Sequence, residues 1–274
     1  MRLLISADIE GVAGVVTREQ TQPKGYEYTE GRIWMTDMVA AAANTAFEMG
    51  VEDVVVVDSH LHGQNIMIDR LPERVTIVRG NPRPLGMVTG VEQGGFDGAL
   101  FLGYHTSSGH ISGILGHTIR GLVVREVRVN DEVVSEASFY HLLLGHFGVP
   151  LIGIAGDDHF VDETKSLCGD VESAVLKWSY GHLSARSLMP AAAHKEVAAM
   201  TRRAVSRIGS FKPRRIEGPV TLCLTFKHRP PAQVLSLLPG VELIDGYTIR
   251  TTLADMQMAS NFMTVAMSYN PSEI

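Results

Sequence analysis

Three apolar runs in the first part of the chain constrain its fold most strongly. The runs lie at residues 1–7, 51–58 and 98–103, and a helix-like segment, Arg32–Met49, separates the first two. Each run is short, aliphatic or β-branched, and lacks the polar alternation of a half-exposed strand, which is typical of strands buried on both faces of a parallel sheet. Strands that alternate with helices in this way predict a parallel, Rossmann-like α/β sheet flanked by helices.

Beyond about residue 162 the pattern changes. Before that point, strand-like runs at 75–80 and 151–158 continue the α/β pattern, and Asn130-Asp131 marks a hairpin turn. After it, Pro-punctuated strands alternate with helical segments. We expect helices near Glu172–Ser179, Ala191–Ile208 and Ala254–Met267, and strands at Val220–Phe226 and Val241–Ile249. The sequence therefore predicts a larger α/β domain over residues 1–162 and a smaller α+β domain over residues 163–274.

Composition excludes several classes of protein. The 274 residues carry a net charge of -6 without a long Lys/Arg run, so nucleic acid is not the expected partner. No apolar run is long enough to span a bilayer, and the first run is too short for a signal peptide. The two cysteines, Cys168 and Cys223, form no disulfide framework. We therefore expect a cytoplasmic protein with no membrane partner.

Acidic and histidine side chains follow the three apolar runs. The first run leads into Asp8-Ile9-Glu10, and Asp58-Ser59-His60 and Tyr104-His105 end the other two. Because side chains alternate along an extended chain, Asp8 and Glu10 project the same way, and two adjacent carboxylates repel unless a cation lies between them. Ligands of parallel α/β sheets bind outside the carboxyl ends of the strands. We therefore expect these side chains to meet at one edge of the sheet.

Imidazole nitrogen and carboxylate oxygen together suit a borderline cation, zinc first, with manganese or cobalt as alternatives. One carboxylate can bridge two ions, as in two-metal hydrolases, and Asp8 is the natural bridge. Each residue taken alone has an ordinary explanation: Asp8 could cap the next segment, Glu10 could be solvated, and His60 or His105 could be a hydrogen-bonded structural residue. Their joint occurrence at three strand ends favours a metal site.

The chain carries short motifs in an order that resembles that of the zinc-dependent D-aminopeptidases associated with dipeptide-permease systems. The resemblance extends over nearly the whole chain. The residues that carry the resemblance are Ser6-x-Asp8-x-Glu10-Gly11, Asp58-Ser59-His60, Gly103-Tyr104-His105, Asn130-Asp131 and Ala155-Gly156-Asp157-Asp158.

The resemblance implies two zinc ions per chain, both bound by Asp8. Glu10 and Glu136 would complete one site, and His60 and His105 would complete the other. It further implies a parallel α/β metal domain, a smaller second domain, and a homo-oligomer, a decamer, that encloses a channel.

The resemblance also implies a catalytic histidine in the Gly-rich loop after His105. His117 matches its position best, and His110 is a nearby competitor. Residue types alone leave this choice open.

The predicted function is a dinuclear zinc aminopeptidase that hydrolyses the N-terminal peptide bond of short peptides. Water bound to such an ion loses its proton near neutral pH, and the resulting metal-bound hydroxide would attack the carbonyl carbon. A preference for D-residues enters only through the resemblance. Asp157 or Asp158 could hold the substrate's α-amino group, although helix capping explains both.

Two other functions compete with this prediction. A dinuclear phosphoesterase would use the same ligand types, but no arginine cluster accompanies them, Arg120 and Arg125 being the only near candidates. A non-catalytic metal- or peptide-binding accessory protein is the second alternative.

Overall fold

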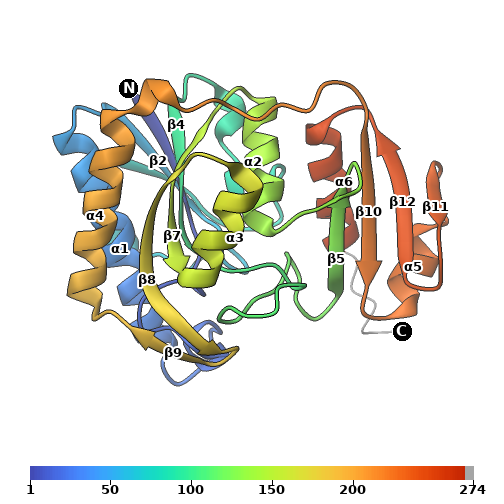
Figure 1. The fold of residues 1–274 in the computed structure, drawn as a ribbon, viewed down its shortest axis with the longest axis horizontal. Coiled ribbons are helices and arrows are strands. Elements are labelled where there is room, and N and C mark those ends of the chain that lie inside the picture. Colours follow the sequence, from blue (N-terminus) through green and yellow to red (C-terminus); the bar gives the residue numbers. More distant parts are fainter. Residues whose placement is uncertain (269–274) are drawn as a thin grey trace.

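A computed structural model describes residues 1–268 and contains two sheets that lie side by side (Figure 1). The larger sheet has seven strands in the order β3-β2-β1-β4-β7-β8-β9, and all pairs are parallel except β8 with β9. This arrangement confirms the predicted parallel α/β sheet. Its strands are β1 (Arg2–Ala7), β2 (Asp53–Asp58), β3 (Val75–Val78), β4 (Gly98–Tyr104), β7 (Leu151–Asp157), β8 (Glu172–Gly181) and β9 (Ser184–Ser187).

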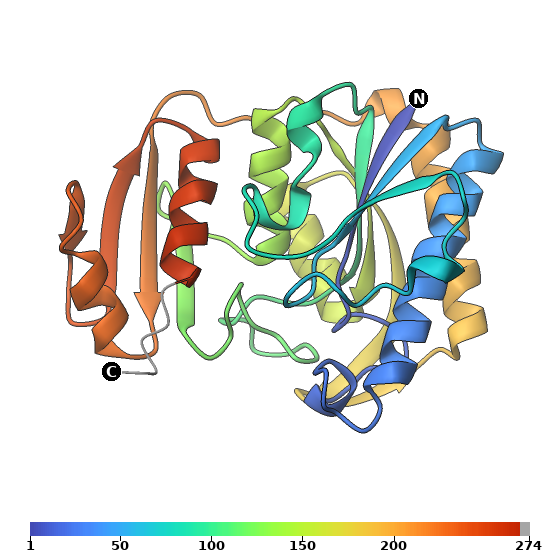
Figure 2. The ribbon, with the colours of Figure 1, turned by 180° about the vertical axis from the view of Figure 1, so that it is seen from behind.

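Helices cover both faces of the larger sheet. Helices α1 (Tyr28–Glu48) and α4 (Pro190–Ser206) pack together on one face, and α2 (Glu136–His146) and α3 (Asp158–Cys168) lie on the other (Figure 2). Local chemistry sets where α2 and α3 begin: the Ser135 hydroxyl accepts a hydrogen bond from the Ser138 N–H (3.2 Å), and the Asp157 carboxylate accepts one from the Phe160 N–H (2.9 Å). Glu136 is thereby fixed as the first residue of α2.

The smaller sheet is antiparallel, in the order β11-β12-β10-β5-β6. Helix α6 (Met256–Ser268) lies between this sheet and α2, and a single hydrophobic core that includes Leu143, Leu222 and Met263 joins the two sheets (Figure 1). No helix within residues 1–268 has the length and apolar character needed to cross a membrane. The remaining elements are β5 (Val124–Val129), β6 (Glu132–Val133), β10 (Val220–Phe226), α5 (Arg229–Leu235), β11 (Val241–Leu243) and β12 (Thr248–Leu253), with 3-10 turns at 18–20, 68–70, 86–88, 91–93 and 208–210.

Two local predictions are corrected by the structure. The expected helix near Glu172–Ser179 is wrong, because this segment forms β8, which pairs with β7 on one side and β9 on the other. The expected strand Val241–Ile249 is two strands, β11 and β12. The Asp245 carboxylate accepts hydrogen bonds from the N–H groups of Tyr247 (2.7 Å) and Thr248 (2.9 Å), which closes the turn between them.

The two sheets do not divide the chain at residue 162. Strands β8 and β9 and helix α4 come after that point and extend the larger sheet and its cover, whereas β5 and β6 come before it and join the smaller sheet. Each sheet is therefore built from chain on both sides of the expected boundary.

The loop that follows β1 packs backbone against backbone on the last residues of β4. The Gly11 N–H donates to the Gly103 carbonyl oxygen (2.7 Å), and the Asp8 N–H donates to the Leu102 carbonyl oxygen (2.8 Å). A Cβ atom on Gly11 would lie 2.0 Å from the Tyr104 carbonyl oxygen, so no larger residue fits there without moving the backbone. This contact fixes the distance between Asp8 and the residues that follow β4.

We predict that Gly11→Ala forces the loop after β1 away from the end of β4. The free energy of unfolding should fall by about 1–3 kcal/mol or more, the usual cost of overpacking. Gly209→Ala is the matched control, because a Cβ atom at Gly209 meets nothing within 4 Å. Urea denaturation of both variants measures the effect, and equal unfolding midpoints would contradict the proposed close approach.

Candidate metal centre

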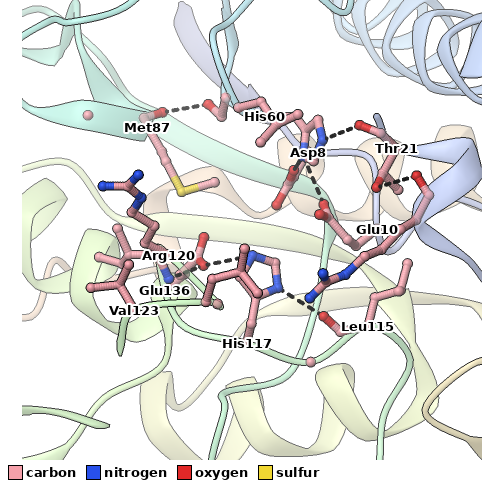
Figure 3. Close-up of a pocket in the computed structure, with 18 of the residues that line it drawn as sticks. Asp8, Glu10, Thr21, His60, Met87, Leu115, His117, Arg120, Val123 and Glu136 are labelled. Carbon is pink, nitrogen blue, oxygen red and sulfur yellow. Dashed lines mark hydrogen bonds and ion pairs between the residues drawn. The ribbon is translucent and has the colours of Figure 1, made fainter. Parts of the chain in front are cut away.

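The structure brings all five predicted ligand residues together at the carboxyl edge of the larger sheet. Figure 3 labels Asp8, Glu10, His60 and Glu136 among them. Because β2, β1 and β4 are neighbours in the sheet, the residues that follow them lie next to one another, and the start of α2 closes the cluster. The ligand side chains are almost completely buried, and all of them except His105 line a cavity of about 1020 Å³. They are Asp8, Glu10, His60, His105 and Glu136.

Asp8, Glu10 and His60 form one half of the cluster. The Nδ1 atom of His60 lies 3.0 Å from Asp8 Oδ1 and 3.1 Å from Glu10 Oε2. The Nε2 atom of His60 lies 2.8 Å from the Thr21 carbonyl oxygen, which can only accept, so in the neutral ring Nε2 carries the hydrogen. The lone pair on Nδ1 then faces both carboxylates, which is the orientation of a metal ligand held by a second partner.

His105 and Glu136 form the other half. The Nε2 atom of His105 lies 3.5 Å from Asp8 Oδ2 and 3.5 Å from Glu136 Oε1. Its Nδ1 atom lies 2.9 Å from the Thr106 carbonyl oxygen and must carry the hydrogen, so the Nε2 lone pair also points at carboxylate oxygens. Glu136 in turn accepts a hydrogen bond from the Ile119 N–H.

Asp8 lies between the two halves, with Oδ1 toward His60 and Oδ2 toward His105. This is the position that a bridging carboxylate needs. The grouping around Asp8 differs from the expected one: Glu10 lies with His60, and Glu136 lies with His105, instead of the two glutamates sharing one site.

The electrostatics of the cluster favour added positive charge. Burial, and then the charge of Glu10, raises the pKa of Asp8 to about 6, and burial also raises the pKa of Glu136. Burial lowers the pKa of His60, but the charges of Glu10 and Asp8 outweigh it and hold that pKa well above its ordinary value. Burial lowers the pKa of His105, which favours the neutral imidazole that binds metals.

Two buried polar atoms in the cluster have no hydrogen-bond partner, Glu10 Oε2 and His105 Nε2. Such atoms are costly unless something binds them. One belongs to each half, and a divalent cation in each half would satisfy both. The oxygen and nitrogen donors present fit zinc or a similar borderline ion.

His117 lies beside the second half of the cluster. Its ring stacks on that of His105, with centroids 3.9 Å apart, and its Nε2 atom lies 3.7 Å from Glu136 Oε1. Its Nδ1 atom lies 2.9 Å from the Leu115 carbonyl oxygen, which leaves the Nε2 lone pair directed at the cluster. The His117 side chain is 25% exposed, against 1% for His105, so it faces the cavity as well as Glu136.

The backbone around His117 is strained. Leu115 and Ile119 have φ angles of 54° and 59°, in the left-handed region that a β-branched residue such as Ile119 strongly disfavours. Conformations of this kind cost about 1–3 kcal/mol each and persist where the surrounding structure enforces them, often at functional sites. The loop therefore holds His117 in a position that relaxed backbone would not give.

The other candidates lie elsewhere or have structural roles. His110 lines a separate, smaller cavity, and its ring lies tilted against that of His159, with centroids 5.5 Å apart. Asp157 caps α3 and also accepts a hydrogen bond from the Ile114 N–H (3.1 Å), and Asp158 accepts one from the Ser179 N–H (3.0 Å). Both aspartates are thus engaged with backbone groups.

Sequence reasoning missed part of the cavity wall. Arg18 and Arg83 line the cavity together with Arg120, whereas Arg125 does not, so Arg120 and Arg125 are not the only near arginines as expected. Arg83 donates to the carbonyl oxygens of Asp58, Gly80 and Gly86, which makes it a structural residue. The carbonyl groups that orient the three histidines could not be found from side-chain patterns, because any residue type supplies a carbonyl.

A parallel α/β sheet with buried carboxylates and imidazoles at its carboxyl edge defines a metal-dependent hydrolase. A family model described as D-aminopeptidase, peptidase family M55, matches residues 1–265, and the chain belongs to this family of peptidases. The family resemblance expected from the sequence is thereby confirmed.

Two relatives are similar to the chain over nearly its full length. It is 30% identical over 266 residues to the D-aminopeptidase of Bacillus subtilis (strain 168), covering 97% of this chain and 96% of that protein. It also matches the solved structure of the Zn-dependent D-aminopeptidase DppA from Bacillus subtilis, a self-compartmentalizing protease. That match has a TM-score of 0.93 at 29% identity and covers 98% of this chain and 97% of the other.

We predict that Asp8→Ala loses both divalent ions, whereas His60→Ala loses mainly one, because only Asp8 faces both halves of the cluster. Elemental analysis after gel filtration, together with titration of metal-free protein, measures the stoichiometry. Equal metal retention in the two variants would remove Asp8 from the bridging role.

Proposed function

We propose that this chain is a dinuclear zinc aminopeptidase that hydrolyses the N-terminal peptide bond of short peptides and prefers D-residues. The observation that carries the proposal is the placement of Asp8, which lines the cavity, between two ligand sets. Family membership supports the peptidase chemistry, and the description of the similar DppA structure as Zn-dependent supports the metal.

Asp8, Glu10, His60, His105 and Glu136 would hold the two ions. When bound, such ions supply an acidified water and polarise the substrate carbonyl. The chain's own contribution is to hold these ligands in one orientation, since the carbonyl oxygens of Thr21 and Thr106 fix the rings of His60 and His105. Burial of the cluster excludes bulk water and strengthens every charge interaction there.

His117 is proposed as the catalytic histidine. Its Nε2 atom faces the cluster and the cavity and is free to take a proton, because Nδ1–H is engaged with the Leu115 carbonyl oxygen. Burial lowers the pKa of His117, but the charges of Glu136 and Glu10 outweigh it and raise that pKa above its ordinary value. His117 could therefore carry the proton to the leaving amine.

The cavity wall fits a peptide with a free carboxylate. Among residues 1–268, the acids that line the cavity are the three cluster carboxylates, and Arg18, Arg120 and Lys227 also line it. The substrate's α-amino group would thus be attracted toward the cluster and its carboxylate toward these cations. This polarity supports short peptides, in which both charged ends are close to the scissile bond.

Comparison of substrates tests the function. Zinc-loaded protein should hydrolyse D-Ala-D-Ala faster than L-Ala-L-Ala and should leave p-nitrophenyl phosphate intact. A phosphoesterase would reverse the second result. Protein verified to hold two ions per chain that binds D-Ala-D-Ala without turnover would instead be a peptide-binding accessory protein.

We predict that His117→Ala lowers kcat on the order of 100- to 10,000-fold, the range for a positioned general acid or base. KM and metal content should change little, because the lost interaction belongs to the transition state. His110→Ala is the matched control from the same loop and should remain active. If His117→Ala also loses metal, His117 is a ligand together with His105 and Glu136.

The chain should also form a large homo-oligomer, because the similar DppA structure is described as self-compartmentalizing. That this oligomer is a decamer rests on the family resemblance alone. Two free cysteines, Cys168 and Cys223, support a cytoplasmic location. Light scattering at micromolar concentration measures the assembly, and a monomer would defeat this part of the proposal without affecting the metal chemistry.

A further inference from the structure

Lys177 is a fully buried lysine in β8, and it contacts the loop that follows β1. Its Nζ atom donates hydrogen bonds to the carbonyl oxygens of Glu10 and Val15. Burying an ammonium group is costly even when it is paired, and an apolar side chain of similar size would usually be at least as stable there. A position of this kind therefore calls for an explanation beyond packing.

The loop that Lys177 contacts contains two of the metal ligands. We call residues 8–16 the β1 exit loop. The β8–β9 hairpin holds this loop at two points, since Lys177 binds it as described and the Ser187 hydroxyl accepts a hydrogen bond from the Gly14 N–H (2.8 Å). On its other side, the Gly11 N–H donates to the Gly103 carbonyl oxygen. The main chain on both sides of Glu10 is thus fixed by neighbouring strands.

Fixing the main chain at Glu10 fixes the direction in which its side chain leaves the backbone. The Oε2 atom of Glu10 lies 3.1 Å from the Nδ1 atom of His60, and in the neutral ring Nδ1 carries no hydrogen to donate to it. Within residues 1–268, His60 is the side chain that contacts this carboxylate, so its orientation depends also on the main chain behind it. Lys177 lies outside the residues that line the cavity and does not reach the substrate.

We infer that Lys177 is a positioning residue for one half of the metal cluster: it holds the main chain of Glu10 so that the Glu10 carboxylate stays directed at the ion shared with Asp8 and His60. The inference rests on the proposed dinuclear site and extends it. It makes the two halves unequal, because the hydrogen bonds of the Lys177 ammonium group within residues 1–268 go to the segment that carries Glu10, and His105 and Glu136 lie on other segments.

Lys177→Met tests the inference, since methionine has similar length but no charge and no hydrogen-bond donor. In zinc titrations of metal-free protein against a chromophoric chelator, one ion should bind as in the parent. The other should bind on the order of 10- to 100-fold more weakly, the usual effect of losing a residue behind a metal ligand. Lys177→Gln, which retains a donor, should recover part of that affinity.

Leu176→Ala is the matched control. Leu176 precedes Lys177 in the same strand and is buried in the core that includes Val197 and Met200 of α4. This variant should unfold at a lower urea concentration, because it leaves a cavity in the core, yet it should bind both zinc ions as tightly as the parent. A loss of stability alone therefore does not reproduce the expected result.

Three outcomes would overturn the inference while leaving the proposed function intact. Lys177→Met could bind both ions as tightly as the parent, it could weaken both ions equally, or neither Lys177 variant could fold, which would make Lys177 a residue of the core. If the parent protein itself fails to bind two ions, the proposed dinuclear site is wrong, and this result contradicts the proposed function.

Discussion

The burial of three carboxylates at one edge of a sheet is the constraint on which the rest of this structure depends. Asp8, Glu10 and Glu136 are each at most 5% exposed and lie within one cluster. Charges of one sign that are removed from water repel strongly, and protonation or a bound cation must compensate them. The imidazoles of His60 and His105 direct lone pairs at these carboxylates. A neutral imidazole does not offset the negative charge, so a proton or a metal ion must lie between the ring and the carboxylate.

The edge of the sheet where this cluster lies could be predicted from sequence. The β-branched run before Asp58 and the apolar run before Tyr104 indicate buried parallel strands, and the ends of such strands meet at one edge. Asp8, His60 and His105 follow from that rule. Glu136 does not, because an acid at a helix start is common for electrostatic reasons alone, and only the family resemblance pointed to it.

Other features depend on contacts between distant residues and could not be predicted. The segment 172–181 resembles a helix locally but forms β8, because β7 offers a partner strand and α3 and α4 cover its faces. The role of Lys177 follows only once β8 is known to lie beside the β1 exit loop. The pairing of Glu10 with His60 likewise depends on which side of Asp8 each loop passes, which sequence spacing does not encode.

The hairpin formed by β5 and β6 has a consequence for how the protein is made. His117 lies shortly before this hairpin and Glu136 directly after it, and β5 pairs with β10, which is almost a hundred residues further along the chain. An isolated two-stranded hairpin is only marginally stable in water. During synthesis on the ribosome, the strands that carry Asp8 and His60 emerge first, whereas Glu10 still lacks its contact with Lys177 of β8 and His117 and Glu136 wait for β10. The newly made chain would therefore complete its metal centre only when the last strand of the set, β10, has emerged.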